Sequence, residues 1–163
     1  MIPLQIPDRG FLQRIGLVVF LVAELEGLLK TDLVRFHPLL PPELDFGGPQ
    51  GQAVTGMTTA QLGKYFVAHA PKSTDPEVAD YYRVGGEALV EIAPNRNAML
   101  HSQPGVDGYD PDQKLRLLRW RVSETKYEAP HMISDEWLDQ FADRLQILRD
   151  QVMATRPSPP GAG

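Results

Sequence analysis

The 163-residue sequence contains no cysteine, and this absence excludes disulfide bonds, thiolate zinc sites and cysteine nucleophiles. Positive charge is also scarce, since 16 Lys and Arg residues stand against 21 Asp and Glu residues and give a net charge of −5. This balance argues against a protein that coats nucleic acid through bulk electrostatics, but it allows an enzyme with a small local basic site. The lack of cysteine fits a reducing compartment, and we expect the protein to be cytoplasmic.

Long hydrophobic runs are missing as well. The apolar run at residues 15–23 has nine residues between Arg14 and Glu24, whereas a membrane-spanning helix needs roughly 20. No small-residue cleavage site follows it. We therefore interpret this run as the buried part of a soluble helix, and we expect no membrane partner.

The sequence also lacks the motifs of several common catalytic sites. The glycine-rich segment 47–52 does not end in the Gly-Lys-Ser/Thr of a phosphate-binding loop, and no Gly-x-Ser-x-Gly elbow supplies a serine nucleophile. We expect no metal and no cofactor, because metal-ligand spacing is absent among the four histidines, which are His37, His69, His101 and His131.

Apolar residues recur at three- and four-residue spacings along much of the chain, which predicts a mainly helical protein. The first helix is expected to begin after Asp8 and to run to about Phe36. Thr58 followed by Gln61 matches a capping box and predicts a second helix that ends near residue 70.

A third helix is expected after Asp75, because the next residue is a proline, which the first turn of a helix tolerates well. This helix should end near residue 93, where Pro94 interrupts it. Asn95 is then placed to cap a short separate helix that ends near residue 102.

The part of the chain after this short helix changes character. Residues 104–112 are rich in turn formers and predict a loop. The alternation of Leu118, Trp120 and Val122 with arginines predicts a half-buried strand, which could pair with residues 126–128 in a hairpin. Ser134 or Asp135 is expected to cap a last helix that ends near residue 152.

Together these elements predict the fold class: mainly α, an antiparallel bundle of about four long helices and a short motif helix, with one small β-hairpin before the last helix. We expect one domain over residues 8–154. A disordered tail, residues 155–163, is expected to follow because it is rich in proline and glycine.

The most informative polar pattern is Arg96-Asn97, followed after three residues by His101. Asparagine directly after the arginine makes the pattern discriminating, because the sequence has only two asparagines. Asn97 and His101 are four residues apart and share a helix face, with Arg96 beside them. In the predicted short helix these residues lie near the N-terminus, which favours anions, and the guanidinium adds a planar fork for phosphate oxygens.

The motif resembles the signature of the HEPN domains (higher eukaryotes and prokaryotes nucleotide-binding), in which arginine and a polar residue precede a histidine by four to six positions. The order of a long first helix, a helical bundle, the motif and a final helix is also similar to this superfamily. The resemblance in architecture covers residues 11–152, and only the six-residue motif is specific in sequence.

The resemblance implies a metal-independent endoribonuclease of a toxin–antitoxin or phage-defence system, with an antitoxin protein as an expected partner. The RNA 2′-hydroxyl would attack the adjacent phosphorus and give a 2′,3′-cyclic phosphate. His101 would act as general acid or base, Arg96 would hold the phosphate, and Asn97 would orient the imidazole or the RNA. A homodimer would form a composite active site, since the reaction uses both an acid and a base.

Two other interpretations remain. Some members of this family keep the fold but are catalytically silent, and serve as adaptor or immunity-type binding proteins. A histidine near a helix end also often pairs only with acidic neighbours or backbone carbonyls.

A second basic group lies on the predicted hairpin, and its arginines are Arg116, Arg119 and Arg121. They could bind RNA phosphates. We favour the structural interpretation, in which charges along a strand edge prevent aggregation.

Overall fold

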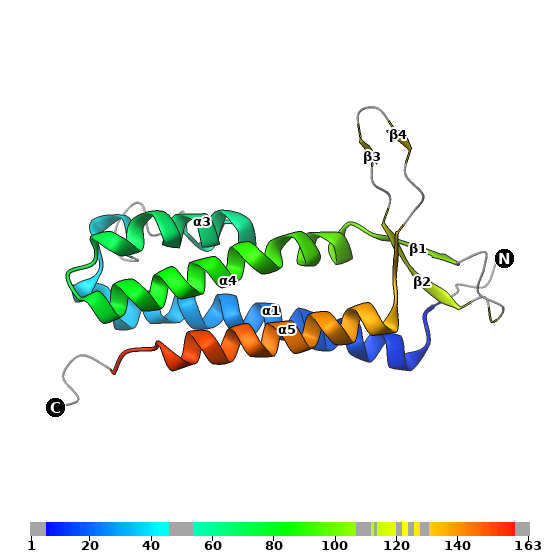
Figure 1. Cartoon of the computed structure of the whole chain (residues 1–163), viewed down its shortest axis with the longest axis horizontal. Helices are drawn as coiled ribbons and strands as arrows, with labels where there is room; N and C mark the ends of the chain where they lie inside the picture. Colours follow the sequence, from blue (N-terminus) through cyan, green and yellow to red (C-terminus); the bar gives the residue numbers. More distant parts are fainter. Residues whose placement is uncertain are drawn as a thin grey trace.

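The computed structural model describes residues 6–45, 54–106, 112, 114–119, 122–123, 126–127 and 131–158. Four helices form a bundle (Figure 1), and they are α1 (Arg9–Arg35), α3 (Thr59–His69), α4 (Pro76–Leu100) and α5 (Asp135–Ala154). Helices α1, α3 and α5 run in one direction, and α4 runs antiparallel to all three. Short 3-10 turns η1 (His37–Leu39), η2 (Pro42–Leu44) and η3 (Ala70–Lys72) lie in the connections. The fold class is therefore mainly α.

The predicted N-caps of the four long helices are confirmed, because each depends on local chemistry. The Asp8 carboxylate accepts from the Phe11 N–H, and Ser134 caps α5 through the Trp137 N–H. The capping box at α3 has both of its hydrogen bonds, and the carboxylate of Asp75 accepts from two N–H groups of the first turn of α4. Each such cap satisfies backbone donors that the helix itself leaves free.

The predicted break at Pro94 is wrong, because α4 runs without interruption from Pro76 to Leu100. A proline in a helix removes one hydrogen bond, here to the carbonyl of residue 90. Pro94 and Val90 both lie on the exposed side of α4, where solvent can reach that carbonyl. Packing of both flanks against the bundle keeps the helix continuous through the site, and Asn95 lies inside it and is not an N-cap.

Glycines bring three helices close together. Gly63 of α3 and Gly86 of α4 face each other, so that a Cβ on Gly63 would lie 2.7 Å from the Gly86 carbonyl oxygen. Gly85 of α4 leaves the space that the side chain of Leu29 of α1 occupies. The core between the helices is apolar and includes Phe11, Leu25, Leu62, Phe66, Tyr82, Leu89, Leu138 and Leu145.

Helix α3 covers only part of the bundle (Figure 1). With 11 residues it is about 16 Å long, whereas α1 has 27 residues and is about 40 Å long. We call the part in which α3 packs on α4 the four-helix half. The three-helix half comprises α1 up to Ala23 and α4 from Ala93 onward, together with the first part of α5. It is here that α4 reaches the small sheet.

That sheet has three antiparallel strands in the order β1-β2-β5, namely β1 (Gln103–Val106), β2 (Leu115–Arg119) and β5 (His131–Ile133). The predicted hairpin is present as β3 (Val122–Ser123) and β4 (Lys126–Tyr127), which form a separate two-stranded pair. The prediction of a loop at 104–112 is wrong at its start, since 104–106 belong to β1; residues 107–111 lie outside the described residues.

The burial pattern of β2 also differs from the predicted alternation. Leu117, not Leu118, pairs with the buried Ile133 and packs against the core. Arg116, which shares the parity of Leu118, is the buried residue of the strand. Trp120 and the side chain of Val122 lie outside the described residues.

One buried polar cluster joins the end of the chain to α1. Asp32 is 1% exposed and receives two hydrogen bonds of 2.7 Å from the guanidinium of Arg156, just after α5. Tyr81 of α4 donates a third hydrogen bond of 2.6 Å to the same carboxylate. Burial and this hydrogen bond raise the pKa of Tyr81. The predicted tail therefore begins with a residue that is bound to the bundle, and 159–163 lie outside the described residues.

Candidate functional site

Arg96, Asn97 and His101 lie together at the C-terminal end of α4. Arg96 and Asn97 are in its last turns and His101 is its C-cap residue, whose backbone N–H donates to the Asn97 carbonyl over 3.0 Å. The predicted helix N-terminus at this motif is therefore wrong, because Pro94 does not break the helix. The carbonyl end of a helix disfavours an anion, so any phosphate binding here must come from the side chains.

Arg96 is half-buried between α4 and α1. It lines a pocket of about 150 Å³ whose other residues are Val19, Val22, Ala23, Glu26, Met99 and Leu100. One guanidinium nitrogen, Nη1, donates to Oδ1 of Asn97 over 3.3 Å. Within the described ranges Arg96 has no ion pair, in contrast to Arg14, Arg83, Arg116, Arg144, Arg149 and Arg156. Its remaining donors can therefore bind an anion.

His101 is exposed at the end of the helix. In the part of the chain that the structure describes, no hydrogen bond or ion pair involves its ring. An imidazole in such a position is accessible to a large substrate and can exchange protons with it. Asn97, one turn earlier on the same face, joins the two other residues, because its side chain accepts from Arg96 and its backbone carbonyl accepts from His101.

Glu26 of α1 is a residue of this pocket that sequence reasoning missed. Its carboxylate accepts a short hydrogen bond from the hydroxyl of Thr59, at the start of α3. The Nζ atom of Lys30, also on α1, lies 3.8 Å from Oε2 of the Glu26 carboxylate. The pocket therefore contains a carboxylate as well as a guanidinium, and the negative charge weakens the attraction of an anion. No signal in the sequence connects Glu26 to a motif 70 positions later.

One of the three arginines of the predicted hairpin has its charge bound inside the protein. Arg116 is buried, and its guanidinium binds Asp8 at 2.9 Å and Asp135 at 2.7 Å while it lies over the ring of Phe11. Its charge is thus balanced inside the protein. Because β2 is the middle strand of the sheet, the expected role at a strand edge is wrong for Arg116. Arg119 is half-buried in β2, and Arg121 lies outside the described residues.

The other histidines have structural neighbours. His37 Nε2 lies 2.9 Å from the Asp45 carboxylate, and the ring of His69 packs on Tyr65 near Glu43. His131 is exposed on β5. Among the described residues no group of three or more His, Asp or Glu side chains is arranged to hold a metal ion.

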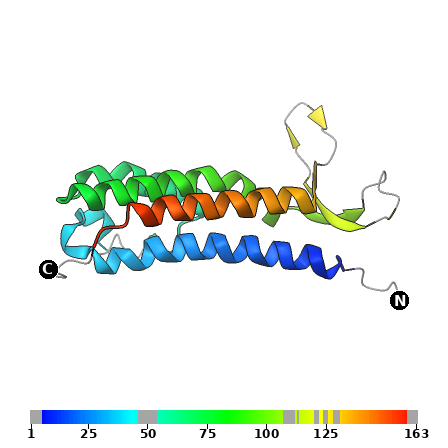
Figure 2. The ribbon, with the colours of Figure 1, turned by 60° about the horizontal axis from the view of Figure 1, so that its bottom comes forward.

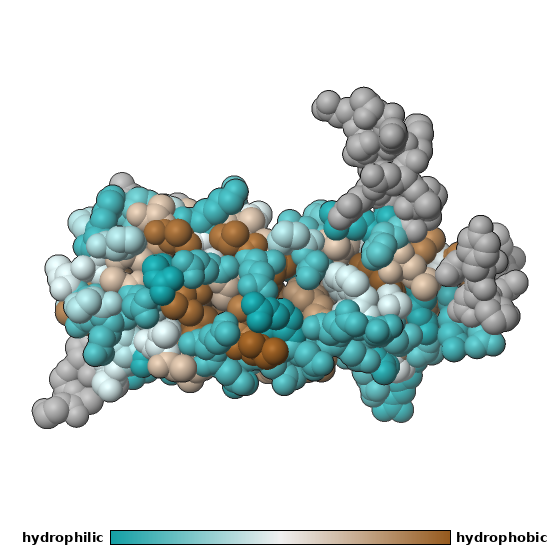
Figure 3. Space-filling model, viewed as in Figure 1, coloured by the Kyte–Doolittle hydropathy of each residue, from teal (hydrophilic) through white to brown (hydrophobic). Residues whose placement is uncertain are grey.

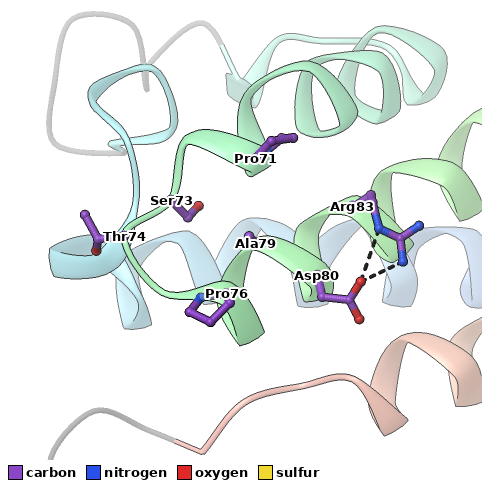
Figure 4. Close-up of a pocket in the computed structure, with 7 residues that line it drawn as sticks. All are labelled: Pro71, Ser73, Thr74, Pro76, Ala79, Asp80 and Arg83. Atoms are coloured by element: carbon purple, nitrogen blue, oxygen red, sulfur yellow. Dashed lines mark hydrogen bonds and ion pairs between the residues drawn. The ribbon is translucent and has the colours of Figure 1, made fainter.

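A larger hollow of about 440 Å³ lies where η3 leads into α4 (Figure 4). Its lining includes Ser73, Ala79 and the Asp80–Arg83 ion pair. Arg83 is also bound by Glu87, so its charge is balanced, and the Ser73 hydroxyl oxygen is buried away from the hollow's solvent. The Thr74 hydroxyl at the rim donates to the Leu39 carbonyl. With the Arg83 charge also bound, the motif at the end of α4 is the better candidate.

No family model, no curated protein and no solved structure matches the chain. Within the described residues no helix has the length and the apolar character needed to cross a membrane. The residues of the site itself are therefore the basis for inferring a function.

Proposed function

We propose that this protein is a metal-independent endoribonuclease whose active site is built from Arg96, Asn97 and His101. The observation that carries the proposal is the pairing of a half-buried arginine without an acidic partner and an exposed histidine in the last turn of one helix. This combination supplies a cation for a phosphate and a group that can move a proton, without a metal. The alternatives at Arg83 and Arg116 are weaker, because the charges of these two residues are balanced within the protein.

The chemistry follows from these two groups. The ring of His101 takes the proton of the RNA 2′-hydroxyl, and the oxygen attacks the adjacent phosphorus. The bond from phosphorus to the 5′-oxygen breaks, and that oxygen receives a proton from a second acid. The products are a 2′,3′-cyclic phosphate and a 5′-hydroxyl. Arg96 neutralises the charge that grows on the non-bridging oxygens, and Asn97 holds the guanidinium in place.

One chain supplies only one histidine at this site, so we propose that a homodimer provides the second acid from the His101 of the other copy. Each His101 would then serve as base for one orientation of the substrate and as acid for the other. The exposure of His101 supports this arrangement, because a ring at the surface can face a second molecule.

Labelled single-stranded RNA incubated with the purified protein in EDTA tests the proposal. Wild type should cut it, and His101→Ala should lower the rate by about 10² to 10⁴, as expected for loss of a general acid or base. Arg96→Ala should lower it by about 10² to 10³. The matched control is His37→Ala, at the opposite end of the bundle, which should cut as fast as wild type.

Intact RNA in the presence of folded wild type, over a diverse set of sequences, would overturn the proposal. A binding protein without catalysis, an adaptor or the partner of an antitoxin, is the second candidate. The carboxylate of Glu26 in the pocket of Arg96 favours it, because that charge competes with a phosphate.

A further inference from the structure

The pocket beside Arg96 is small and mostly apolar. Figures 1 and 2 show α3 beside only the half of the bundle that is far from the sheet. The pocket lies where that cover begins, because Thr59 is the first residue of α3 and its hydroxyl donates to Glu26 in the pocket lining. Five of the seven lining residues are apolar, namely Val19, Val22, Ala23, Met99 and Leu100.

The volume of about 150 Å³ limits what this pocket can hold. Pockets for drug-sized ligands occupy about 300 to 1,000 Å³, whereas an apolar cavity of about 150 Å³ accommodates a benzene ring. The pocket therefore has room for one flat ring system and not for a whole nucleotide. A base that is unstacked from single-stranded RNA is such a group, and proteins read it by contacts to its faces and edges.

Glu26 adds two directed acceptors to this apolar lining. Its side chain is 20% exposed, and Oε1 accepts a hydrogen bond of 2.5 Å from the hydroxyl of the buried Thr59, which fixes the direction of the carboxylate. Among the described residues Oε2 accepts no hydrogen bond, since Nζ of Lys30 lies 3.8 Å away. A carboxylate that is largely removed from water and has free lone pairs gains from each further donor.

The four RNA bases differ in how well they fit a carboxylate. Guanine has two adjacent donors on its Watson–Crick edge, N1–H and the 2-amino group, and they match the two oxygens of one carboxylate. In adenine and cytosine one amino donor lies beside a ring nitrogen that accepts, and in uracil one N–H lies between two carbonyl oxygens. Those acceptors would face the negative oxygens of the carboxylate, so these three bases are disfavoured.

We propose that this pocket binds a guanine base of single-stranded RNA and that Glu26 selects guanine. The base packs on the apolar lining, its N1–H and 2-amino groups donate to Glu26, and Arg96 holds the phosphate of the same nucleotide. Thr59 is a positioning residue, because its hydroxyl holds the carboxylate. The proposal rests on the proposed function, and it predicts that the enzyme cuts RNA next to guanosine.

This assignment accounts for a carboxylate in a pocket that also contains a cation. The negative charge of Glu26 by itself weakens the binding of any phosphate at Arg96. The two donors of guanine offset this loss, whereas the other bases leave it in place. The pocket therefore selects by rejecting other nucleotides as well as by binding the nucleotide of guanine.

A second apolar hollow shows what distinguishes the pocket of Arg96. On the face shown in Figure 3 the hydrophobic residues lie in small separate groups among hydrophilic ones. A hollow of about 450 Å³ between α3 and α4 is lined by Lys64, Val67, Ala68, Glu87, Val90 and Glu91. Arg83 binds Glu87 and Arg144 binds Glu91. Both of its carboxylates thus have an arginine partner, whereas the one hydrogen bond that Glu26 receives within the described chain comes from a neutral hydroxyl.

Binding of nucleoside 3′-monophosphates tests the pocket without any cleavage, because these compounds resemble a reaction product. Isothermal titration calorimetry with the full chain should show the tightest binding for guanosine 3′-monophosphate. The inosine compound lacks the 2-amino group and should bind about 10- to 100-fold more weakly, as expected for the loss of one hydrogen bond to a charged group. The adenosine, cytidine and uridine compounds should bind no better than the inosine compound.

Glu26→Gln should remove this preference, because the amide keeps an acceptor for Thr59 but replaces one carboxylate oxygen with a donor. The matched control is Glu24→Gln, which changes another carboxylate of α1, one that is paired with Arg149, and should keep the preference. Thr59→Val should reduce the preference and Thr59→Ser, which retains the hydroxyl, should restore it. A general loss of structure would lower the affinity for every nucleotide and would not change the ratio between guanosine and inosine compounds.

Filling the pocket is a second test that leaves the carboxylate unchanged. Ala23 lines the pocket from an exposed position on α1, so Ala23→Leu can occupy the space of the base without disturbing the core. This variant should weaken the binding of guanosine 3′-monophosphate by at least about 10-fold, with the helix content of wild type in circular dichroism. Unchanged binding in Ala23→Leu would overturn the pocket.

Equal binding of the guanosine and inosine compounds, or a preference that survives Glu26→Gln, would overturn the selection by Glu26. Absence of nucleotide binding to the wild type would overturn the pocket itself. The preference should be the same in His101→Ala, because His101 does not line the pocket.

These outcomes separate the two proposals. Cleavage of RNA without preference for guanosine would contradict the guanine pocket and leave the ribonuclease standing. Binding of guanosine 3′-monophosphate that depends on Glu26, together with intact RNA, would contradict the ribonuclease and leave the pocket as a guanine nucleotide site.

Discussion

The Asp32 cluster in the four-helix half and the motif at the end of α4 treat their polar groups in opposite ways. In the four-helix half the buried carboxylate of Asp32 is bound by Arg156 and Tyr81, so that its charge is balanced within the fold. At the end of α4, Arg96 has the neighbouring Asn97 amide as its one hydrogen-bond partner among the described residues, and the His101 side chain has none there. The glycines differ as well. Gly63 and Gly86 let α3 and α4 approach closely, whereas a Cβ on Gly16 of α1 would meet nothing within 4 Å.

This difference separates polar groups that stabilise the fold from polar groups that are available to bind a ligand. A polar group whose bonds are all made inside the protein stabilises the fold but has nothing left for a ligand. Groups without internal partners contribute little to stability, and their bonds remain available for a substrate or a second chain. The comparison therefore predicts that substitutions in the Asp32 cluster affect unfolding, and that substitutions in the motif affect the proposed binding and catalysis.

The largest expected effect on stability comes from breaking the buried pair. Arg156→Ala leaves the carboxylate of Asp32 buried without a counter-charge, and we expect a loss of about 3 kcal/mol in the free energy of unfolding. Urea denaturation measures it. The control Arg149→Ala removes a more exposed pair with Glu24 and should lose less than about 1 kcal/mol. Equal losses of unfolding free energy in Arg156→Ala and Arg149→Ala would contradict the expectation that the buried ion pair stabilises more than the exposed one.

The glycines provide a smaller test of the same comparison. Gly63→Ala places a Cβ 2.7 Å from a backbone oxygen and 2.8 Å from a backbone nitrogen of α4, which cannot move aside cheaply. We expect a loss of about 1 to 3 kcal/mol. Gly16→Ala meets open space and should gain about 0.5 to 1 kcal/mol through helix propensity. Both are measured at protein concentrations low enough for the chain to be monomeric; a gain for Gly63→Ala would refute the close approach.

The smallest effect is expected from surface carboxylates at low pH. Hydrogen bonds from Lys72 hold the pKa of Glu43 below its ordinary value of 4.5, and Arg144 does the same for Glu91. A pKa lowered by folding adds stability that is complete above the ordinary pKa and is lost as the pH falls through the lower folded value. Unfolding between pH 6 and pH 3 should therefore become easier below about pH 4.5, and less so in Glu43→Gln. High salt should reduce the difference, because these groups are near the surface.

Local signals in the sequence predicted the local structure well. Each N-cap depends on residues within one helical turn, so Asp8, Thr58 and Ser134 could be read directly from spacing. The predicted helix break at Pro94 was wrong. The sequence shows the local cost of a proline inside a helix, but not the packing against other helices that outweighs this cost.

Contacts between distant parts of the chain could not be predicted. Arg116 has the same parity along β2 as Leu118. Two carboxylates allow its burial, and one of them, Asp8, lies 108 positions earlier in the chain. The pattern of Arg96, Asn97 and His101 can be seen in the sequence, but the residues that surround it in the fold cannot. The pocket of Arg96 depends on where α1 crosses α4 and on how short α3 is, and no spacing within the motif encodes either.

The bond between Asp32 and Arg156 has a consequence for how the protein is made. The two residues are 124 positions apart, and at a synthesis rate of about 5 to 20 residues per second Asp32 is made about 6 to 25 seconds before its partner. Until then its carboxylate remains in water, since burial without a counter-charge is unfavourable. Helix α1 can therefore complete its packing only when the last helix has left the ribosome, so the bundle closes after translation of α5.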